Sequence, residues 1–294
     1  VGVEKGLYAE ALGQDKLEVK TFNAGPEATE ALLSEAIDAT YIGPNPAINA
    51  FVKTKGGIRI ISGATSGGAA LVTKPSITDV SQLRGKKIAS PQLGNTQDVA
   101  LRSWLKEKGL NADAQQGGDV SIKPQENSLT LDSFKAGQID GAWVPEPWVS
   151  RLVLDGGGKV LIDEKTLWPE GEFVTTHLIV RAKFLEEHPD TVKRLLEGQV
   201  AANEYLTENS TEAQTVVNEG IAKITGKKLA DNVIAAAFKN LKFTDDPIAS
   251  SLQASADHAV EVGLLEKPDL TGIYDLKLLN AVLKAKGLTA VKGL

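Results

Sequence analysis

The sequence predicts an α/β protein of two Rossmann-like lobes joined by a two-strand hinge. Short apolar strands alternate with amphipathic helices over roughly the first 180 residues, a pattern typical of parallel sheets. A polar turn between Pro75 and Gly85 separates two such runs, and the apolar stretch Thr175–Val180 can return the chain to the first lobe. After Phe184 the pattern is almost entirely helical, so we expect these helices to pack on lobe one.

The expected division follows from these two crossings. Lobe one comprises residues 1–74 and 179–294, and lobe two comprises residues 75–178.

The individual elements are predicted from apolar periodicity. Strands are expected where apolar residues alternate or run together, at 16–22, 39–42, 58–62, 71–73, 87–89, 120–122, 139–144, 159–162 and 175–180. Helices are expected where apolar residues recur three or four apart, at 7–12, 26–37, 47–53, 94–108, 128–136 and 147–154.

Composition excludes several classes of function. Thirty-two basic residues against 38 acidic ones give a net charge of −6 with no basic run, which argues against nucleic acid as a partner. No apolar stretch approaches the ~20 residues that span a bilayer. The chain has no cysteine and only three histidines without metal-ligand spacing, so we expect no cofactor and no metal. It also lacks a Gly-x-Ser-x-Gly sequence, so catalysis is poorly supported.

Three junctions that we interpret as strand-to-helix turns gather glycines with short polar side chains. They are Gly43-Pro44-Asn45-Pro46, the stretch 64–69 with Ser66, Gly67 and Gly68, and the stretch 91–98 with Gly94, Asn95, Thr96 and Gln97. Helix N-termini offer free N–H groups and partial positive charge to an anion. The alternative is that these residues only cap helices and form turns.

The arginines, Arg102 among them, lie in segments typical of solvated faces. The junctions therefore predict a small anion held by directed hydrogen bonds from neutral donors.

The segment Ile139–Trp148 holds two tryptophans at the end of an expected strand. Pro145 and Pro147 end the strand, so Trp143 and Trp148 either cover a ligand or fill the core. Glu146 either meets a ligand amine or caps the next helix. His177 is a candidate base, or a hydrogen-bonded histidine of the hinge or pocket.

Several segments resemble, in order and over essentially the whole chain, the substrate-binding proteins of bacterial ABC importers for aliphatic sulfonates, taurine and nitrate. The matching segments are 3–8, 38–44, 83–89, 94–100, 137–148 and 188–190. The resemblance implies two α/β lobes with a ligand cleft between them that closes on the ligand. By position it implies that Gly43, Pro44, Asn45, Ser66, Gly67 and Gly68 line the cleft from lobe one. From lobe two it implies that the cleft is lined by Gly94, Asn95, Thr96, Gln97, Trp143, Glu146 and Trp148. Thr175, Thr176 and His177 would lie where the chain returns to lobe one.

The resemblance implies a binding protein rather than an enzyme, and most favours an aliphatic sulfonate or taurine as ligand. It further implies a monomer that delivers its ligand to a membrane permease. Its location would be the periplasm or the outer face of the cytoplasmic membrane, with a lipid anchor as one option. Nitrate and a pyrimidine precursor remain alternatives, as does an enzyme similar to the pyrimidine-forming enzymes of thiamin synthesis, which use a cysteine-rich segment that this chain lacks. Similar proteins begin with a strand and a polar loop, so we expect the natural protein to carry further residues before Val1.

Overall fold

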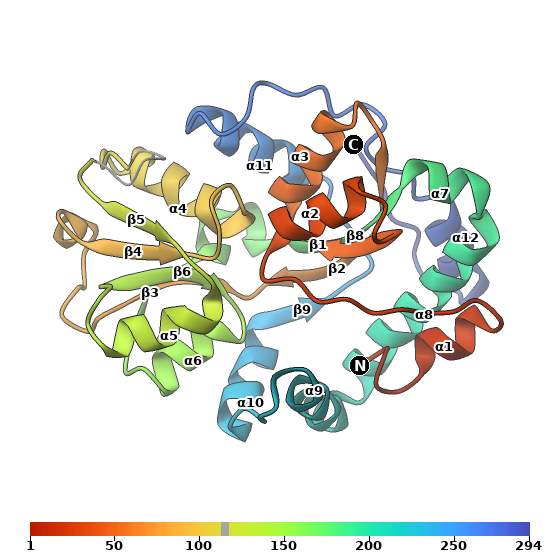
Figure 1. Cartoon of the computed structure of the whole chain (residues 1–294), viewed down its shortest axis with the longest axis horizontal. Coiled ribbons are helices and arrows are strands. Elements are labelled where there is room, and N and C mark those ends of the chain that lie inside the picture. Colours follow the sequence, from red (N-terminus) through yellow and green to blue (C-terminus); the bar gives the residue numbers. More distant parts are fainter. Residues whose placement is uncertain (113–117) are drawn as a thin grey trace.

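The computed structural model describes residues 1–112 and 118–294, whose strands form two separate sheets (Figure 1). The four-stranded sheet has the order β1 (Ala39–Ile42), β8 (Val174–Arg181), β2 (Ile58–Gly67) and β9 (Leu241–Phe243). The five-stranded sheet has the order β5 (Ser121–Pro124), β4 (Lys87–Ser90), β6 (Gly141–Pro145), β3 (Ala69–Thr73) and β7 (Lys159–Asp163). We call the four-stranded sheet with its helices lobe one and the five-stranded sheet with its helices lobe two. Two α/β lobes are as predicted.

Strand direction departs from the expected parallel sheets. Within the five-stranded sheet β4 runs parallel to β5 and β6, but β3 is antiparallel to β6 and β7. In the four-stranded sheet β8 is antiparallel to both β1 and β2, and β9 is antiparallel to β2. The reason is the hinge: β2 leaves lobe one and β8 returns to it, so these neighbours must run in opposite directions.

The chain crosses between the lobes at two places. Gly67 and Gly68 join β2 directly to β3, both with positive φ (74° and 73°), and β8 carries the chain back. At this hinge the Thr175 Oγ1 donates a hydrogen bond to the Gly67 carbonyl at 2.6 Å, which ties the two crossings together.

The sheets divide the chain differently from the expected boundaries after residues 74 and 178. Strand β3 lies in the sheet of lobe two, and β8 pairs with β2 from Val174 onward. We therefore propose lobe borders at residues 68 and 173.

Helices cover both sheets (Figure 1). Those of lobe one are α1 (Leu7–Leu12), α2 (Gly25–Leu33), α3 (Pro44–Lys53), α7 (Ala182–Glu187), α8 (Pro189–Glu208), α9 (Ser210–Thr225), α10 (Asp231–Asn240), α11 (Ser250–Glu261) and α12 (Lys277–Ala285). Those of lobe two are α4 (Thr96–Glu107), α5 (Asn127–Lys135) and α6 (Trp148–Leu154). Short 3₁₀ turns lie at Val80–Leu83, Glu164–Leu167 and Pro169–Gly171.

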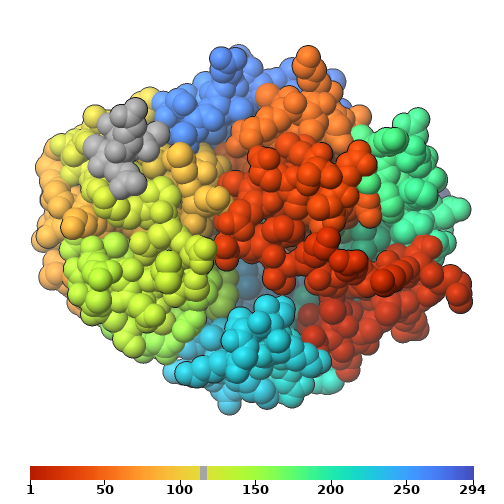
Figure 2. Space-filling model, in the orientation of Figure 1, coloured from red at the N-terminus to blue at the C-terminus, as the bar shows by residue number. Residues whose placement is uncertain are grey.

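The C-terminal helices pack on lobe one, as expected, but two of them also reach lobe two. Helices α8 and α12 pack against each other and against strands β9 and β2 respectively. Helix α11 contacts α4, and α10 contacts α6, so both touch the other lobe. Figure 2 shows the yellow-green surface of lobe two adjoining the surfaces of lobe one.

Each sheet has an apolar core on both faces, because successive residues of a strand point to opposite sides. In β2, Ile60 packs into a cluster with Ile48 and Leu252, whereas Ile61 packs on the other face with Leu196. In lobe two the same alternation separates Leu71, Trp143 and their neighbours from Val72, Ala142 and theirs. The face of the sheet to which a side chain points therefore decides which core cluster it joins.

The prediction of a strand at residues 16–22 is wrong. The segment Lys16–Phe22 is irregular and exposed. Strand β1 pairs with β8 on one side, and a pocket separates its other edge from this segment. An alternating sequence therefore lies next to a sheet without joining it, because the pocket lies between it and the free edge of β1. Of the described residues, no helix is long and apolar enough to cross a bilayer.

Candidate functional site

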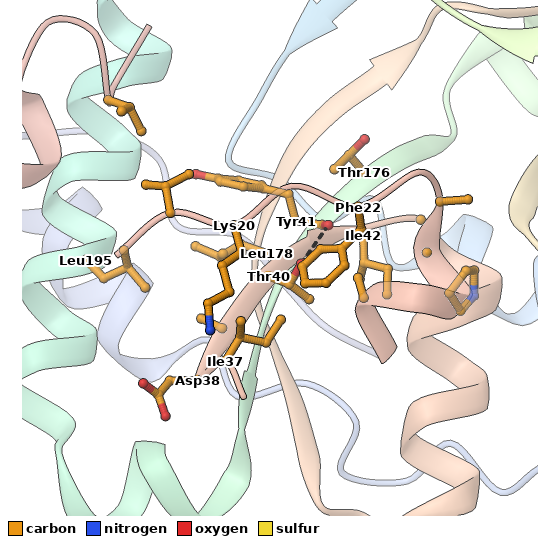
Figure 3. A pocket seen from close by; sticks show the side chains of 18 of the residues that line it. Lys20, Phe22, Ile37, Asp38, Thr40, Tyr41, Ile42, Thr176, Leu178 and Leu195 are labelled. Atoms are coloured by element: carbon orange, nitrogen blue, oxygen red, sulfur yellow. Dashed lines mark hydrogen bonds between the residues drawn. The ribbon is translucent and has the colours of Figure 1, made fainter. Parts of the chain in front are cut away.

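A pocket of about 740 Å³ opens between the lobes and continues along the free edge of β1. At the interlobe end its walls are polar and come from both lobes: Gly43, Asn95, Thr96, Gln97, Asn127, Thr175 and Thr176. Apolar side chains of the segment 17–22 and of α8 also line it, with Lys20 and Asp38 among the charged ones. Figure 3 shows Phe22, Ile42 and Thr176 near one end and Leu195 toward the other.

The N-terminus of α4 forms the polar wall of lobe two. Strand β4 ends at Ser90, and Asn95 caps the helix with its Oδ1, which accepts a hydrogen bond from the Asp98 N–H at 2.9 Å. The Asn95 Nδ2 also donates to the Gln97 Oε1 at 3.1 Å. A capped N-terminus still leaves N–H groups of the first turn without helical partners, so it suits an anion. The predicted strand-to-helix junction at 91–98 therefore exists and faces the pocket.

Thr96, the first residue of α4, has a buried hydroxyl that the protein does not satisfy. The residue is 7% exposed, and its Oγ1 has no hydrogen-bond partner among the described residues. Such a group is costly to bury unless something binds it. Across the cleft, a Cβ added to Gly43 would lie 2.1 Å from this oxygen, so glycine is needed where lobe one meets lobe two. Asn127, at the start of α5, has a second unpartnered oxygen, Oδ1, in the same wall.

A buried ion pair lies one turn into α4. The Asp98 and Arg102 side chains are 0% and 1% exposed, with the Arg102 Nε 2.9 Å from the Asp98 Oδ2. The expectation that Arg102 lies on a solvated face is therefore wrong. Its i,i+4 spacing from Asp98 is a pattern that could have identified the pair.

The hinge holds another group of predicted residues. Ser66 and Gly67 end β2, so the expected strand-to-helix turn at 64–69 is instead a strand-to-strand crossing. Ser66, Gly67 and Gly68 lie outside the pocket lining, whereas Thr175 and Thr176 lie within it. The Thr175 hydroxyl is used by Gly67, which leaves Thr176 as the hinge side chain directed to the site.

Trp143 belongs to the core of lobe two rather than to the cleft. It is completely buried, packs edge-on against Trp104 with ring centroids 5.8 Å apart, and donates from its Nε1 to the Glu164 Oε2 at 2.7 Å. Burial raises the pKa of the Glu164 carboxyl to about 7, against the opposing effect of hydrogen bonds from Trp143 and Trp168. Helix α4 covers the face of β6 on which Trp143 lies, and Trp143 packs there in one cluster with Leu71 and Trp104.

Glu146 and Trp148 are also occupied elsewhere. The Glu146 carboxylate accepts hydrogen bonds from the Ser150 N–H at 3.0 Å, from its hydroxyl at 2.9 Å, and from the Asn240 Nδ2 at 2.6 Å. It therefore holds the first turn of α6, as its capping alternative predicts, and ties lobe two to α10. The Arg151 guanidinium lies 4.5 Å from the centre of the Trp148 ring. Neither residue lines the pocket.

The remaining predicted residues form contacts within the protein that shape its helices and loops. Pro44 opens α3, Asn45 donates to the Ser255 carbonyl at 2.8 Å, and Gly94 gives its N–H to the Asp98 Oδ2 at 2.9 Å. His177 is completely buried, with its Nε2 3.1 Å from the Pro247 carbonyl. Burial lowers the pKa of this imidazole to about 4. It therefore takes the hydrogen-bonded alternative rather than the role of an exposed base.

Asn23 was not predicted, yet it bridges the lobes at the mouth of the cleft. Its Nδ2 donates to the Glu126 Oε1 of lobe two at 3.0 Å, and its N–H donates to the Glu27 Oε2 of α2 at 3.2 Å. This hydrogen bond thus joins lobe one to lobe two beside the pocket. Among the described residues, no group of three His, Cys, Asp or Glu side chains could hold a metal ion.

The model of one protein family, described as NMT1-like, matches residues 1–221 of the 294. The chain belongs to the NMT1-like family. A relative in Bacillus subtilis (strain 168), provisionally named an aliphatic sulfonates-binding protein, is 26% identical over 292 residues, which are 97% of this chain and 84% of the relative.

Solved structures share the fold. The alkanesulfonate-binding protein SsuA from Xanthomonas axonopodis pv. citri, bound to MOPS, has a TM-score of 0.75 at 20% identity and covers 90% of this chain and 89% of its own. The periplasmic nitrate-binding protein NrtA from Synechocystis PCC 6803 has a TM-score of 0.79 at 18% identity. The match covers 97% of this chain and 84% of NrtA. These members and neighbours are binding proteins, and the likeness places this chain in the two-lobed periplasmic-binding-protein fold.

Proposed function

We propose that the protein captures a small organic anion, above all an aliphatic sulfonate, between its lobes and delivers it to the permease of an ABC importer. The observation that carries this proposal is the unsatisfied Thr96 hydroxyl at the N-terminus of α4, buried in the wall of the interlobe pocket. Family membership and the sulfonate-binding relative agree with it.

The anionic head would lie at the first turn of α4. There the Thr96 hydroxyl and the free N–H groups of the helix can donate to its oxygens, with Thr176 opposite on the hinge. Gly43 lets lobe one approach closely enough to close the site. Closure removes water, which strengthens each of these hydrogen bonds.

The organic part of the ligand needs an apolar wall, which the two tryptophans do not supply. Phe22, Ile42 and Pro145 line the same pocket and provide apolar surface. A bare inorganic anion such as nitrate gains little from them. Taurine is less favoured than a plain sulfonate, because the carboxylate that would receive its amine, Glu146, is taken by Ser150 and Asn240. A pyrimidine precursor loses the stacking partners that it would have had in Trp143 and Trp148.

The partners and location follow from the family and are proposed with the function. The protein would act as a monomer in the periplasm or, if lipid-anchored, at the outer face of the cytoplasmic membrane.

A thermal-shift panel of alkanesulfonates, taurine, nitrate, sulfate and pyrimidines tests this proposal. A ligand at 100 times its Kd adds about 2.7 kcal/mol of stability, which raises the melting temperature by about 5 °C in a protein of this size. We expect the largest rise for an alkanesulfonate. Thr96→Val should reduce that affinity about tenfold, whereas Thr225→Val, on the exposed end of α9, should not change it. A rise with a pyrimidine alone, or turnover of any ligand, would contradict the proposal.

A further inference from the structure

The ion pair of Asp98 and Arg102 lies directly beneath the first turn of α4. Asp98 accepts hydrogen bonds from the Ser90 hydroxyl at 2.6 Å and from the Gly94 N–H at 2.9 Å, so it holds both ends of the loop 90–94 against the helix. It also receives the Arg102 Nε at 2.9 Å and Nη2 at 3.3 Å. The loop that presents Thr96 to the pocket is thus built around one carboxylate.

This carboxylate creates an electrostatic difficulty. A negative charge in the first turn favours the helix, since it interacts with the partial positive charge of the N-terminus. The same negative charge opposes a bound anion, and burial makes the opposition stronger because solvent screens it little. Arg102 is buried with it and compensates for that charge within one turn of helix.

We propose that Arg102 is a positioning and charge-setting residue of the anion site: by pairing with Asp98 it lets this carboxylate shape the loop without repelling the ligand. The inference rests on the proposed function and assigns a binding role to a residue that touches no ligand itself. It predicts opposite effects for the two members of the pair. A purely structural pair predicts the same sign for both, because either truncation would loosen the loop.

The experiment measures the Kd of ethanesulfonate by calorimetry for the wild type, Asp98→Asn, Arg102→Gln and Arg102→Lys. Arg102→Gln leaves the carboxylate uncompensated and should weaken binding by at least about tenfold. Asp98→Asn removes the negative charge. Its amide oxygen can still accept from the Gly94 N–H and its NH2 can donate to the Ser90 hydroxyl, which is able to accept. The substitution should therefore strengthen binding by about three- to tenfold. Arg102→Lys keeps the charge and should stay within about threefold of the wild type.

Two controls separate charge from loss of fold. Ethanesulfonamide, the neutral counterpart of the ligand, should bind all four proteins within about twofold of one another. The exposed pair of Arg84 and Asp119 in the same lobe is the matched control: Arg84→Gln and Asp119→Asn should leave the ethanesulfonate Kd within about twofold. If Arg102→Gln does not fold, as judged by circular dichroism, the comparison of Asp98→Asn with Arg102→Lys decides the question.

The outcomes are distinct. Tighter binding by Asp98→Asn together with weaker binding by Arg102→Gln, or with near wild-type binding by Arg102→Lys, supports the inference. Weaker binding by Asp98→Asn as well as by the Arg102 variant overturns it and leaves the proposed function standing. A wild-type protein that binds none of the anions in the panel overturns the proposed function and this inference with it.

Discussion

His177 and Glu164 are ionisable side chains that the fold encloses almost completely, one in each lobe. Burial disfavours the charged form of both. It lowers the pKa of the His177 imidazole to about 4 and raises that of the Glu164 carboxyl to about 7. The two residues therefore make the free energy of unfolding depend on pH in opposite directions.

His177→Gln should remove part of the acid sensitivity of the protein. In the unfolded chain the imidazole takes up a proton below about pH 6.5, whereas the folded protein keeps it neutral to about pH 4. Stability from this residue is thus present above pH 6.5 and is lost as pH falls toward 4, by up to about 3 kcal/mol. Urea unfolding at pH 4.5 and 7.5 measures the difference, with His188→Gln as the surface control. An unchanged acid slope in His177→Gln would refute the assignment.

Glu164→Gln should stabilise the protein above neutral pH. The unfolded carboxyl ionises above about pH 4.5 while the folded one keeps its proton to about pH 7, so stability present at low pH is lost as pH rises across that interval. Glutamine retains an oxygen for the Trp143 Nε1 and has no charge to bury. We expect a gain of about 2–3 kcal/mol at pH 8 and little at pH 4, measured by urea unfolding. The exposed Glu170→Gln serves as control, and an equal gain at both pH values would argue against a buried charge.

At the scale of the element, the capped N-terminus of α4 combines stability and binding. Asn95 accepts from the Asp98 N–H, and loss of such a cap costs about 1 kcal/mol. Asn95→Ala should therefore lower the free energy of unfolding by about that amount. Asn95→Asp keeps the cap oxygen but loses the donor to the Gln97 Oε1 and buries a negative charge beside the site. It should therefore also lower stability, and it should weaken ethanesulfonate binding more than Asn95→Ala does. Parallel unfolding and calorimetry on the two variants provide the check, and equal affinities would speak against an anion at this helix.

The same elements show which features of the structure the sequence can predict. Strand β1 and the start of α4 could be predicted, because apolar periodicity and the cap residues are local properties. The failure at Lys16–Phe22 has a non-local cause, since an alternating segment becomes a strand only within hydrogen-bonding distance of another strand, and here a pocket separates it from β1. Likewise Trp143 is buried because helices cover both faces of the five-stranded sheet, and the sequence of β6 alone does not show this. The prediction that the start of α4 faces the cleft agrees with the pocket lining. The contacts of Asn23 and Arg102 were not predicted, because their partners lie in the other lobe or one helical turn away.

At the scale of the whole molecule, contacts in several regions of the described residues hold the lobes together. Helix α11 contacts α4 on one side, and α10 contacts α6 on another, where Asn240 donates to Glu146. Asn23 spans the mouth of the cleft to Glu126. The hinge at Gly67 and Thr175 lies between these regions, so opening the cleft must break contacts far from the ligand as well as near it.

Asn23→Ala should accelerate ligand release. The hydrogen bond to Glu126 exists only while the lobes are closed, and an exposed bond of this kind contributes about 0.5–1 kcal/mol, which corresponds to a two- to fivefold faster dissociation rate. Stopped-flow displacement of ethanesulfonate measures it. Glu126→Gln keeps the accepting oxygen and should behave like the wild type, and ligand-free unfolding should be the same for all three proteins. An unaltered release rate in Asn23→Ala would show that this contact does not hold the lobes closed.

The aromatic residues are divided between the two lobes. All four tryptophans (104, 143, 148 and 168) lie in lobe two, and all four tyrosines (8, 41, 205 and 274) lie in lobe one. Trp168 lies at the border, stacked on Phe173 and tilted toward His258 of α11. Indole emission therefore comes from lobe two, and the efficiency of energy transfer from tyrosine to tryptophan depends on the distance between the lobes. Intrinsic fluorescence of the unlabelled protein can therefore report a change in the distance between the lobes.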